Sequence, residues 1–120
     1  MSRIATVLCV LALAGVAAVP VANAGPTEAK TEVHSKCGTY VCVHTAHIGR
    51  YVRDITVESK DGLKGEMHTW WGNYDPEHQN KVRGYWEPNR EQTGSNAKLV
   101  CGEMLRGGKR VEYHCVNLDQ

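Results

Sequence analysis

Five large aromatic residues gather in one stretch of the sequence, and they are the side chains best suited to binding. They are Trp70, Trp71, Tyr74, Tyr85 and Trp86. Aromatic rings with a polar group can stack on a sugar or form a hot spot for a protein partner. Because neighbouring residues on a strand point to opposite faces, Trp70 and Trp71 cannot both be internal. The competing structural interpretation places Trp71 in the core and Trp70 under the loop that carries Tyr74. As contact residues we predict Trp70, Tyr74, Tyr85 and Trp86.

The histidines offer metal ligands, but their spacing argues against a shared site. His44 and His47 are three residues apart, and positions three apart on a strand point to opposite faces. They can share a metal only if the chain bends between them. The other candidates, His68, His78 and His114, are scattered along the chain. We therefore expect no metal site and no cofactor.

The sequence contains no arrangement of residues typical of an enzyme. It has no Gly-x-Ser-x-Gly motif, and the serines after residue 24 are Ser35, Ser59 and Ser95. Each lies in a polar arm or turn without a partnered histidine in the local sequence. Carboxylates suited to glycoside hydrolysis are present, but nothing selects a pair. We predict that the protein is not an enzyme.

The first 24 residues have the three parts of a secretory signal peptide. Arg3 supplies a positive charge, residues 4–19 are apolar, and Ala22, Asn23 and Ala24 form a small-x-small cleavage site. The apolar run ends in this processing site, so we expect no membrane anchor. Residues 1–24 are the predicted signal peptide, and the mature chain from residue 25 to 120 is expected to be secreted to the extracellular space.

The charge balance argues against nucleic acid as a partner. The sequence has 14 Lys and Arg residues and 13 Asp and Glu residues. Loss of Arg3 with the signal peptide leaves 13 of each, so the mature chain carries no net charge when its histidines are neutral. No basic surface is then available to hold a phosphate backbone.

Four cysteines remain in the mature chain, and in an exported protein they predict two disulfides. They are Cys37, Cys42, Cys101 and Cys115. We favour a Cys101–Cys115 bridge across the last hairpin, where a three-residue loop or a bulge would bring the two residues opposite each other. Cys37 and Cys42 would then close a short local loop. The rival is a long-range pairing that ties the first strand to the last hairpin.

From Cys37 onward the chain alternates apolar and polar residues with a period of two, which predicts strands. No segment has an apolar stripe at helical spacing. The sequence therefore predicts one all-β domain over residues 37–120, a small antiparallel sandwich or partly open barrel. Asp61-Gly62 favours a hairpin turn, so the second and third strands should pair with each other. The expected strands cover residues 40–44, 51–58, 63–71, 82–87, 97–105 and 110–118.

Residues 25–36 are polar and precede the first cysteine, which predicts a flexible arm outside the core. Such an arm can also add as a strand to the edge of a partner's sheet. Within it, Thr31, Glu32, Val33 and His34 are the candidate contact residues.

The chain resembles small secreted proteins of filamentous actinobacteria in several features taken together. These are the alanine-rich signal, the polar arm, the four cysteines, the Trp70-Trp71-Gly72 turn and the final cysteine hairpin. Among such proteins it is similar to the small adaptor subunit of umbrella toxin particles. In that family the adaptor joins a lectin-bearing, trypsin-like but inactive subunit to a repeat-bearing toxin chain. The resemblance implies that residues 25–36 insert into a groove of the lectin-bearing subunit and that the β domain grips the toxin repeats.

These observations predict a secreted protein-binding adaptor whose partners are other secreted proteins of an extracellular assembly. One alternative is a carbohydrate-binding module or small lectin, with the aromatic residues as its platform. Another is a secreted inhibitor or stand-alone toxin that acts through the loop at residues 72–81 or 89–96.

Overall fold

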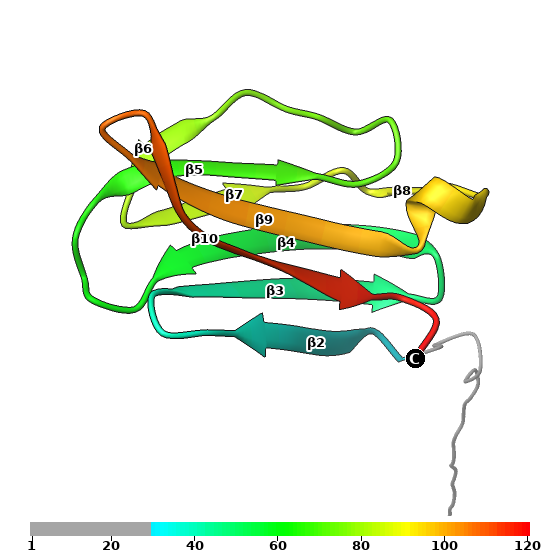
Figure 1. The fold of residues 1–120 in the computed structure, drawn as a ribbon. Helices are drawn as coiled ribbons and strands as arrows, with labels where there is room; N and C mark the ends of the chain where they lie inside the picture. Colours follow the sequence, from blue (N-terminus) through cyan, green and yellow to red (C-terminus); the bar gives the residue numbers. More distant parts are fainter. Residues whose placement is uncertain (1–29) are drawn as a thin grey trace, which may run out of the picture. The chain divides into compact units, whose positions relative to one another are not determined.

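The computed structural model describes residues 30–120, which form two antiparallel β-sheets (Figure 1). This confirms the predicted all-β class, as a sandwich and not a closed barrel. The predicted signal peptide, residues 1–24, and the first part of the predicted arm lie outside the described residues. Within residues 30–120, no helix has the length and hydropathy that a membrane crossing requires. The elements are β2 (Glu32–Cys37), β3 (Val41–Ile48), β4 (Tyr51–Ser59), β5 (Gly65–Trp70), β6 (Gln79–Lys81), β7 (Arg83–Trp86), β8 (Arg90–Glu91), a 3-10 turn (Ser95–Ala97), β9 (Leu99–Arg106) and β10 (Lys109–Asn117).

The strand order defines the two layers. The first sheet has the order β2-β3-β4-β7, with β8 paired to β4, and the second sheet has the order β10-β9-β5-β6. Every strand pair is antiparallel. Strand β10 also contacts β3 and β2 of the first sheet (Figure 1). The second sheet therefore covers the first, and β10 lies beside the edge strand β2.

The core lies between the two sheets and is filled from alternate strand positions, as the period of two predicts. Because Gly102 of β9 has no side chain, the sheets can approach closely there. A Cβ at that position would lie 2.5 Å from Cγ2 of Val57 and 2.9 Å from Cγ2 of Val43. The core side chains include Val41, Val43, Ile55 and Val57 from the first sheet and Met67, Val100, Met104 and Val116 from the second.

Both favoured disulfides are present. Cys37 pairs with Cys42, and Cys101 pairs with Cys115. The register of β9 and β10 shifts between Arg110 and Glu112, and this bulge places Cys115 directly opposite Cys101. The prediction that a bulge would align the two cysteines is confirmed, and the long-range pairing is excluded.

The predicted hairpin between the second and third strands is wrong. Asp61-Gly62 does turn, with Gly62 at a φ of 77°, but β4 pairs with β3, β7 and β8 while β5 belongs to the other sheet. Arg106 of β9 donates hydrogen bonds at 2.8 Å to both Asp61 carboxylate oxygens and to the Leu63 carbonyl oxygen. The Arg106 bonds to the carboxylate, with those from the Ser59 hydroxyl and the Leu63 N–H, hold the pKa of the Asp61 carboxyl far below its usual range. The turn is thus a crossover tied to the second sheet.

The predicted flexible arm over residues 25–36 is wrong for its second half. Residues 32–37 form β2, which pairs with β3 from Glu32 opposite His47 to Cys37 opposite Cys42. The compact unit accordingly starts at Thr31, six residues before the predicted domain boundary at Cys37. An edge strand is solvated on most sides, so polar side chains do not prevent it from pairing.

Candidate binding face on the second sheet

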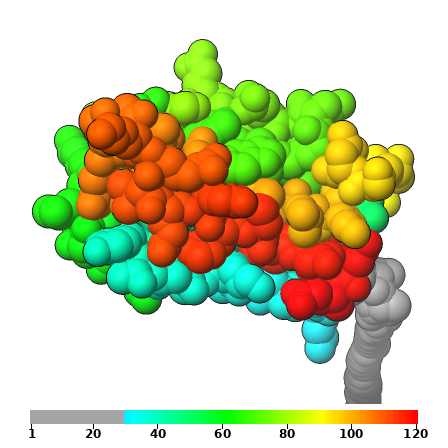
Figure 2. Space-filling view, in the orientation of Figure 1, coloured from blue at the N-terminus to red at the C-terminus, as the bar shows by residue number. Residues whose placement is uncertain are grey.

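The face of the second sheet that points away from the core carries a group of aromatic and charged side chains that contact one another. We call it the outer face. Its members come from alternate positions of β5, β9 and β10, because successive strand residues point to opposite sides. Figure 2 shows the side of the molecule on which β10 lies. The outer face consists of Glu66, His68, Trp70, Cys101, Glu103, Leu105, Arg110, Tyr113 and Cys115, with His78 and Asn80 from β6 and the loop before it.

Trp70 and Tyr113 form the aromatic centre of the outer face. Their ring centroids are 6.3 Å apart, and the ring planes are inclined by 32°. The Arg110 guanidinium lies over the Tyr113 ring, with its carbon 4.4 Å from the centroid. Trp70 is half-buried, whereas 48% of Tyr113 is exposed. Trp70 on β5 lies opposite Cys101 on β9, and the Cys101–Cys115 disulfide joins β9 to β10 at this position.

A chain of hydrogen bonds orients the polar and charged side chains beside the two rings. His68 lies between two carboxylates, with Nδ1 2.9 Å from Glu103 Oε2 and Nε2 2.5 Å from Asp75 Oδ1. Arg110 donates from Nε to the other Glu103 oxygen at 2.7 Å. Burial alone would raise the pKa of Glu103, but the bonds from His68 and Arg110 outweigh it and lower this pKa. The Arg110 group over Tyr113 is therefore held in place by a buried anion.

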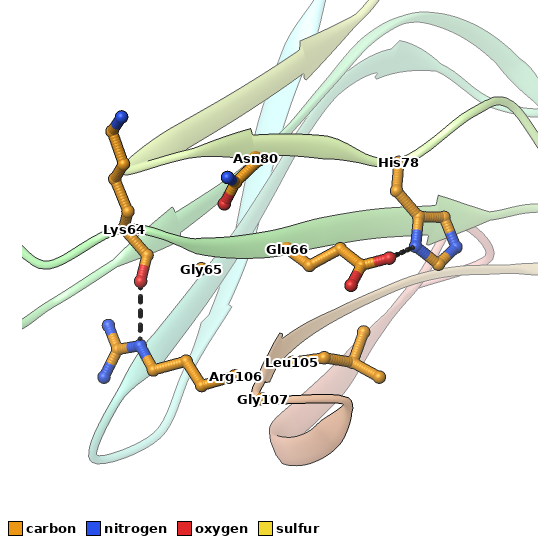
Figure 3. Close-up of a pocket in the computed structure, with 8 residues that line it drawn as sticks. All are labelled: Lys64, Gly65, Glu66, His78, Asn80, Leu105, Arg106 and Gly107. Atoms are coloured by element: carbon orange, nitrogen blue, oxygen red, sulfur yellow. Dashed lines mark hydrogen bonds and ion pairs between the residues drawn. The ribbon is translucent and has the colours of Figure 1, made fainter.

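An open hollow of about 440 Å³ adjoins this network (Figure 3). Glu66, His78, Asn80 and Leu105 belong to both the hollow and the outer face, and the Glu66 and His78 side chains are hydrogen-bonded to each other. Arg106 closes one side by donating from Nε to the Lys64 carbonyl oxygen at 3.0 Å. The lining offers charged and amide groups to a polar ligand. Its residues are Lys64, Gly65, Glu66, His78, Asn80, Leu105, Arg106 and Gly107.

The structure separates the predicted aromatic group into residues with different roles. Trp70 lies on the outer face and Trp71 is fully buried, where its indole N–H donates to the Ala97 carbonyl oxygen at 2.7 Å. This confirms that the two tryptophans point to opposite faces. Tyr74 pairs through its backbone with Trp71 and packs against the core. The ring neighbours of Trp70 are instead His68 and Tyr113.

The prediction of Trp86 as a contact residue is wrong. Only 6% of this side chain is exposed, and its indole N–H donates to the Glu77 carbonyl oxygen at 3.2 Å. Tyr85, the neighbour on β7, is 46% exposed and donates from its hydroxyl to Glu87 at 3.0 Å. Tyr85 belongs to the first sheet, so it does not extend the outer face of the second. The five aromatics do not form one platform.

The four predicted arm contacts lie at or beside the free edge of the first sheet. Thr31 precedes β2, and Glu32, Val33 and His34 open it. Val33 is 64% exposed, whereas His34 is partly buried against His47. Among the described strands, β2 pairs only with β3, so its second edge carries backbone groups that have no strand partner. This edge is a separate surface from the outer face.

One line of side chains on the first sheet has the order of a hydrolytic triad. Ser35 Oγ lies 2.6 Å from His44 Nδ1, and His44 Nε2 lies 2.9 Å from Glu58 Oε2. The local sequence could not show this line, because its members lie on three adjacent strands. Ser35 is in the middle of β2, directly opposite His44 on β3. The described hollow lies on the other sheet, so Ser35 does not open into it.

Sequence reasoning missed the partners of Trp70. Tyr113 is two residues before Cys115 and so shares its face, and the favoured Cys101–Cys115 bridge fixes that face relative to the neighbouring strand. What the sequence could not show is that Trp70 lies opposite Cys101, because the chain passes through the other sheet between β5 and β9.

Comparison with known proteins adds no family: no family model, curated protein or solved structure matches this chain.

Proposed function

We propose that the protein is a secreted, non-enzymatic binding module that attaches to other extracellular proteins through the outer face. The observation that carries this proposal is the contact of Trp70, Tyr113 and Arg110 on one exposed sheet surface. Trp, Tyr and Arg are the residue types most enriched among binding hot spots. Arg110 is already held by Glu103 at 2.7 Å, so a partner would bind it with little loss of side-chain freedom.

Secretion is part of the proposal and has two supports. The sequence begins with a predicted signal peptide, and the two disulfides belong to an oxidising environment. The disulfides and the absence of a membrane-crossing helix from residues 30–120 are compatible with an extracellular protein.

The adaptor role requires two surfaces, and the fold offers two. The outer face belongs to the second sheet, whereas the free edge of β2 belongs to the first. An exposed edge strand can accept a strand from a partner, with backbone hydrogen bonds giving affinity. In an assembly like the umbrella toxin particles that the sequence resembles, the residues at the β2 edge would meet the lectin-bearing subunit. The outer face would meet the repeat-bearing toxin chain.

The experiment that tests this proposal is affinity capture from the culture supernatant of the producing organism. The mature chain and its Trp70→Ala and Tyr113→Ala variants serve as bait, with Tyr85→Ala as the control because Tyr85 is an exposed tyrosine of the other sheet. We expect the same secreted proteins on the mature chain and the control, and their loss from both outer-face variants. Equal capture by all four baits would show that the outer face does not bind these proteins.

A carbohydrate is the second candidate ligand, and the hollow in Figure 3 favours it. Its charged and amide side chains lie next to the outer face, and aromatic stacking with nearby polar groups suits a sugar. Retention on polysaccharide columns distinguishes the two functions. If Trp70→Ala keeps its protein partners but is no longer retained on polysaccharide, the module is a lectin and not an adaptor.

A further inference from the structure

Two histidines at the edge of the first sheet share an unusually direct contact. His34 on β2 and His47 on β3 lie with Nδ1 and Nε2 2.7 Å apart. His47 is 2% exposed, and it is one of the few polar side chains buried to this degree. Glu32 lies directly opposite His47 in the strand register, and its carboxylate is 3.7 Å from His34 Nε2. These three side chains therefore point to one side of β2 and meet at one end of that strand.

We propose that Glu32, His34 and His47 form a binding site for a divalent transition-metal ion of the zinc class. The ligand atoms of the three residues all lie within 4.8 Å of one another. Two imidazoles and one carboxylate make a donor set that zinc accepts, with a fourth position left for water or a partner's side chain. Calcium and magnesium prefer oxygen ligands, so two nitrogen donors select against them.

The hydrogen bonding of His47 prepares it as a ligand. Its Nδ1 lies 2.9 Å from the Gly49 carbonyl oxygen, which can only accept, so Nδ1 carries a proton and donates. In the neutral ring this leaves a lone pair on Nε2, which is the atom that faces His34. A backbone carbonyl that fixes the other ring nitrogen in this way is the usual support of a metal-bound histidine.

The site needs only a small adjustment to accept the ion. In the present geometry the two ring nitrogens are 2.7 Å apart, so with a lone pair on His47 Nε2 it is His34 Nδ1 that donates the hydrogen bond, and the ion would replace this proton. Tetrahedral zinc with bonds of about 2.0–2.1 Å would separate them by about 3.3 Å. The movement can come from His34 and Glu32, since their side chains are 34% and 62% exposed. His47 can stay in its buried position.

The other group of potential metal ligands that the described residues of the first sheet offer has only two available donors, His44 and Glu58. Cys42, His44 and Glu58 also lie close together, but the Cys42 sulfur is bonded to Cys37. As strand geometry predicts, His44 and His47 point to opposite faces, because their partners Ser35 and His34 are adjacent on β2. The expectation that these two histidines do not share a metal holds, but β2 supplies His47 with different partners.

With a metal at this site, β2 would be fastened to β3 at both of its ends, by the ion at one and by a disulfide at the other. The Cys37–Cys42 disulfide already joins the last residue of β2 to β3, and Glu32 opposite His47 marks the first residue. The bound ion would therefore hold the first residues of the exposed edge strand β2 against β3. Metal binding would control whether this end of the edge is ordered, independently of the outer face.

The test is zinc titration of the mature, untagged chain after treatment with a chelator, followed by calorimetry. We expect one zinc ion per chain, and His34→Ala should weaken binding about tenfold or more. His44→Ala and His78→Ala are matched controls, because both remove a histidine from another pair. Since His47 is buried and its loss can unfold the chain, Glu32→Gln at an exposed position provides the second variant, and it should also weaken binding.

Cobalt absorption gives a second measurement that does not depend on the stability of a variant. Cobalt bound to nitrogen and oxygen ligands at a four-coordinate site shows a visible band that zinc removes by competition. Absence of stoichiometric zinc binding to the mature chain would overturn the proposal. Binding that His34→Ala leaves unchanged, or that His44→Ala weakens equally, would also overturn it.

Discussion

Glu112 of β10 holds the loop that joins β2 to β3, and we predict that its replacement destabilises the fold. Its Oε1 accepts hydrogen bonds from the backbone N–H groups of Tyr40 and Val41 at 2.9 and 2.8 Å, and Oε2 accepts one from Thr39 at 3.1 Å. Gly38 leaves room for the carboxylate, since a Cβ there would lie 2.6 Å from Glu112 Oε2. One side chain of the second sheet therefore fixes a loop of the first.

The substitution Glu112→Gln keeps the shape of this side chain and removes its charge. One carboxylate oxygen becomes an NH2 group, which cannot accept a hydrogen bond from a backbone N–H. A hydrogen bond to a charged group contributes about 1.5–3 kcal/mol, and water replaces part of this for the exposed Thr39 and Tyr40. We therefore expect the free energy of unfolding to fall by about 2 kcal/mol at neutral pH.

The pH dependence of stability checks the same contact. Burial alone would raise the pKa of Glu112, but the backbone N–H donors and His114 outweigh it, so the pKa lies below its ordinary value of 4.5. A carboxyl with a lower pKa in the folded chain stabilises it above the unfolded pKa and loses this effect as the pH falls through the folded pKa. The difference between the wild type and Glu112→Gln should therefore shrink below pH 4.5.

Urea denaturation with intact disulfides, followed by tryptophan fluorescence, measures both effects. Glu91→Gln on β8 is the control, because Glu91 is an exposed glutamate of a short strand. It should change the free energy of unfolding by less than about 0.5 kcal/mol. If Glu112→Gln is as stable as this control at neutral pH, or keeps a constant difference from wild type in acid, the role assigned to Glu112 is refuted.

Three further predictions concern the core and the disulfides. Trp71→Ala should cost about 3–5 kcal/mol in chemical denaturation, because it empties a fully buried site and leaves the Ala97 carbonyl oxygen without its donor. Gly102→Ala should cost about 1–3 kcal/mol, since its Cβ would meet valine side chains at less than 3 Å; a neutral result would mean that the sheets separate easily. Removing the Cys101–Cys115 bridge should cost about 3 kcal/mol, and thiol titration of the secreted, non-reduced protein should find no free cysteine.

The period-two pattern allowed strand faces to be predicted, but for β7 it did not show which face is inside. Alternation places Trp70 and Trp71 on opposite faces of their strand, and it does the same for Tyr85 and Trp86. For β7 the inward side is decided by Gly84, whose missing side chain leaves the space that the Trp86 ring fills. A Cβ there would lie 2.7 Å from that ring. Such packing depends on neighbours distant in the sequence, so the burial of Trp86 could not be predicted locally.

Strand pairing was the part of the fold that local sequence could not supply. The Asp61-Gly62 turn was predicted correctly as a turn, but β7 occupies the edge of β4 that a hairpin would have used. Residues 32–37 look like a free arm because they are polar, and they become a strand only because β3 offers a complete register of partners. The Cys101–Cys115 register could be predicted, because a covalent bond restricts the pairing to one arrangement.

The affinity of Trp70→Ala for a captured partner measures whether the outer face binds protein. Titration calorimetry with the purified partner compares the mature chain, this variant and the control Tyr85→Ala on the first sheet. If the outer face is the contact surface, Trp70→Ala should bind about 30-fold more weakly, which corresponds to about 2 kcal/mol, and the control should bind like the mature chain. If Trp70→Ala is folded and keeps the affinity of the mature chain, the outer face is not the site through which this protein binds.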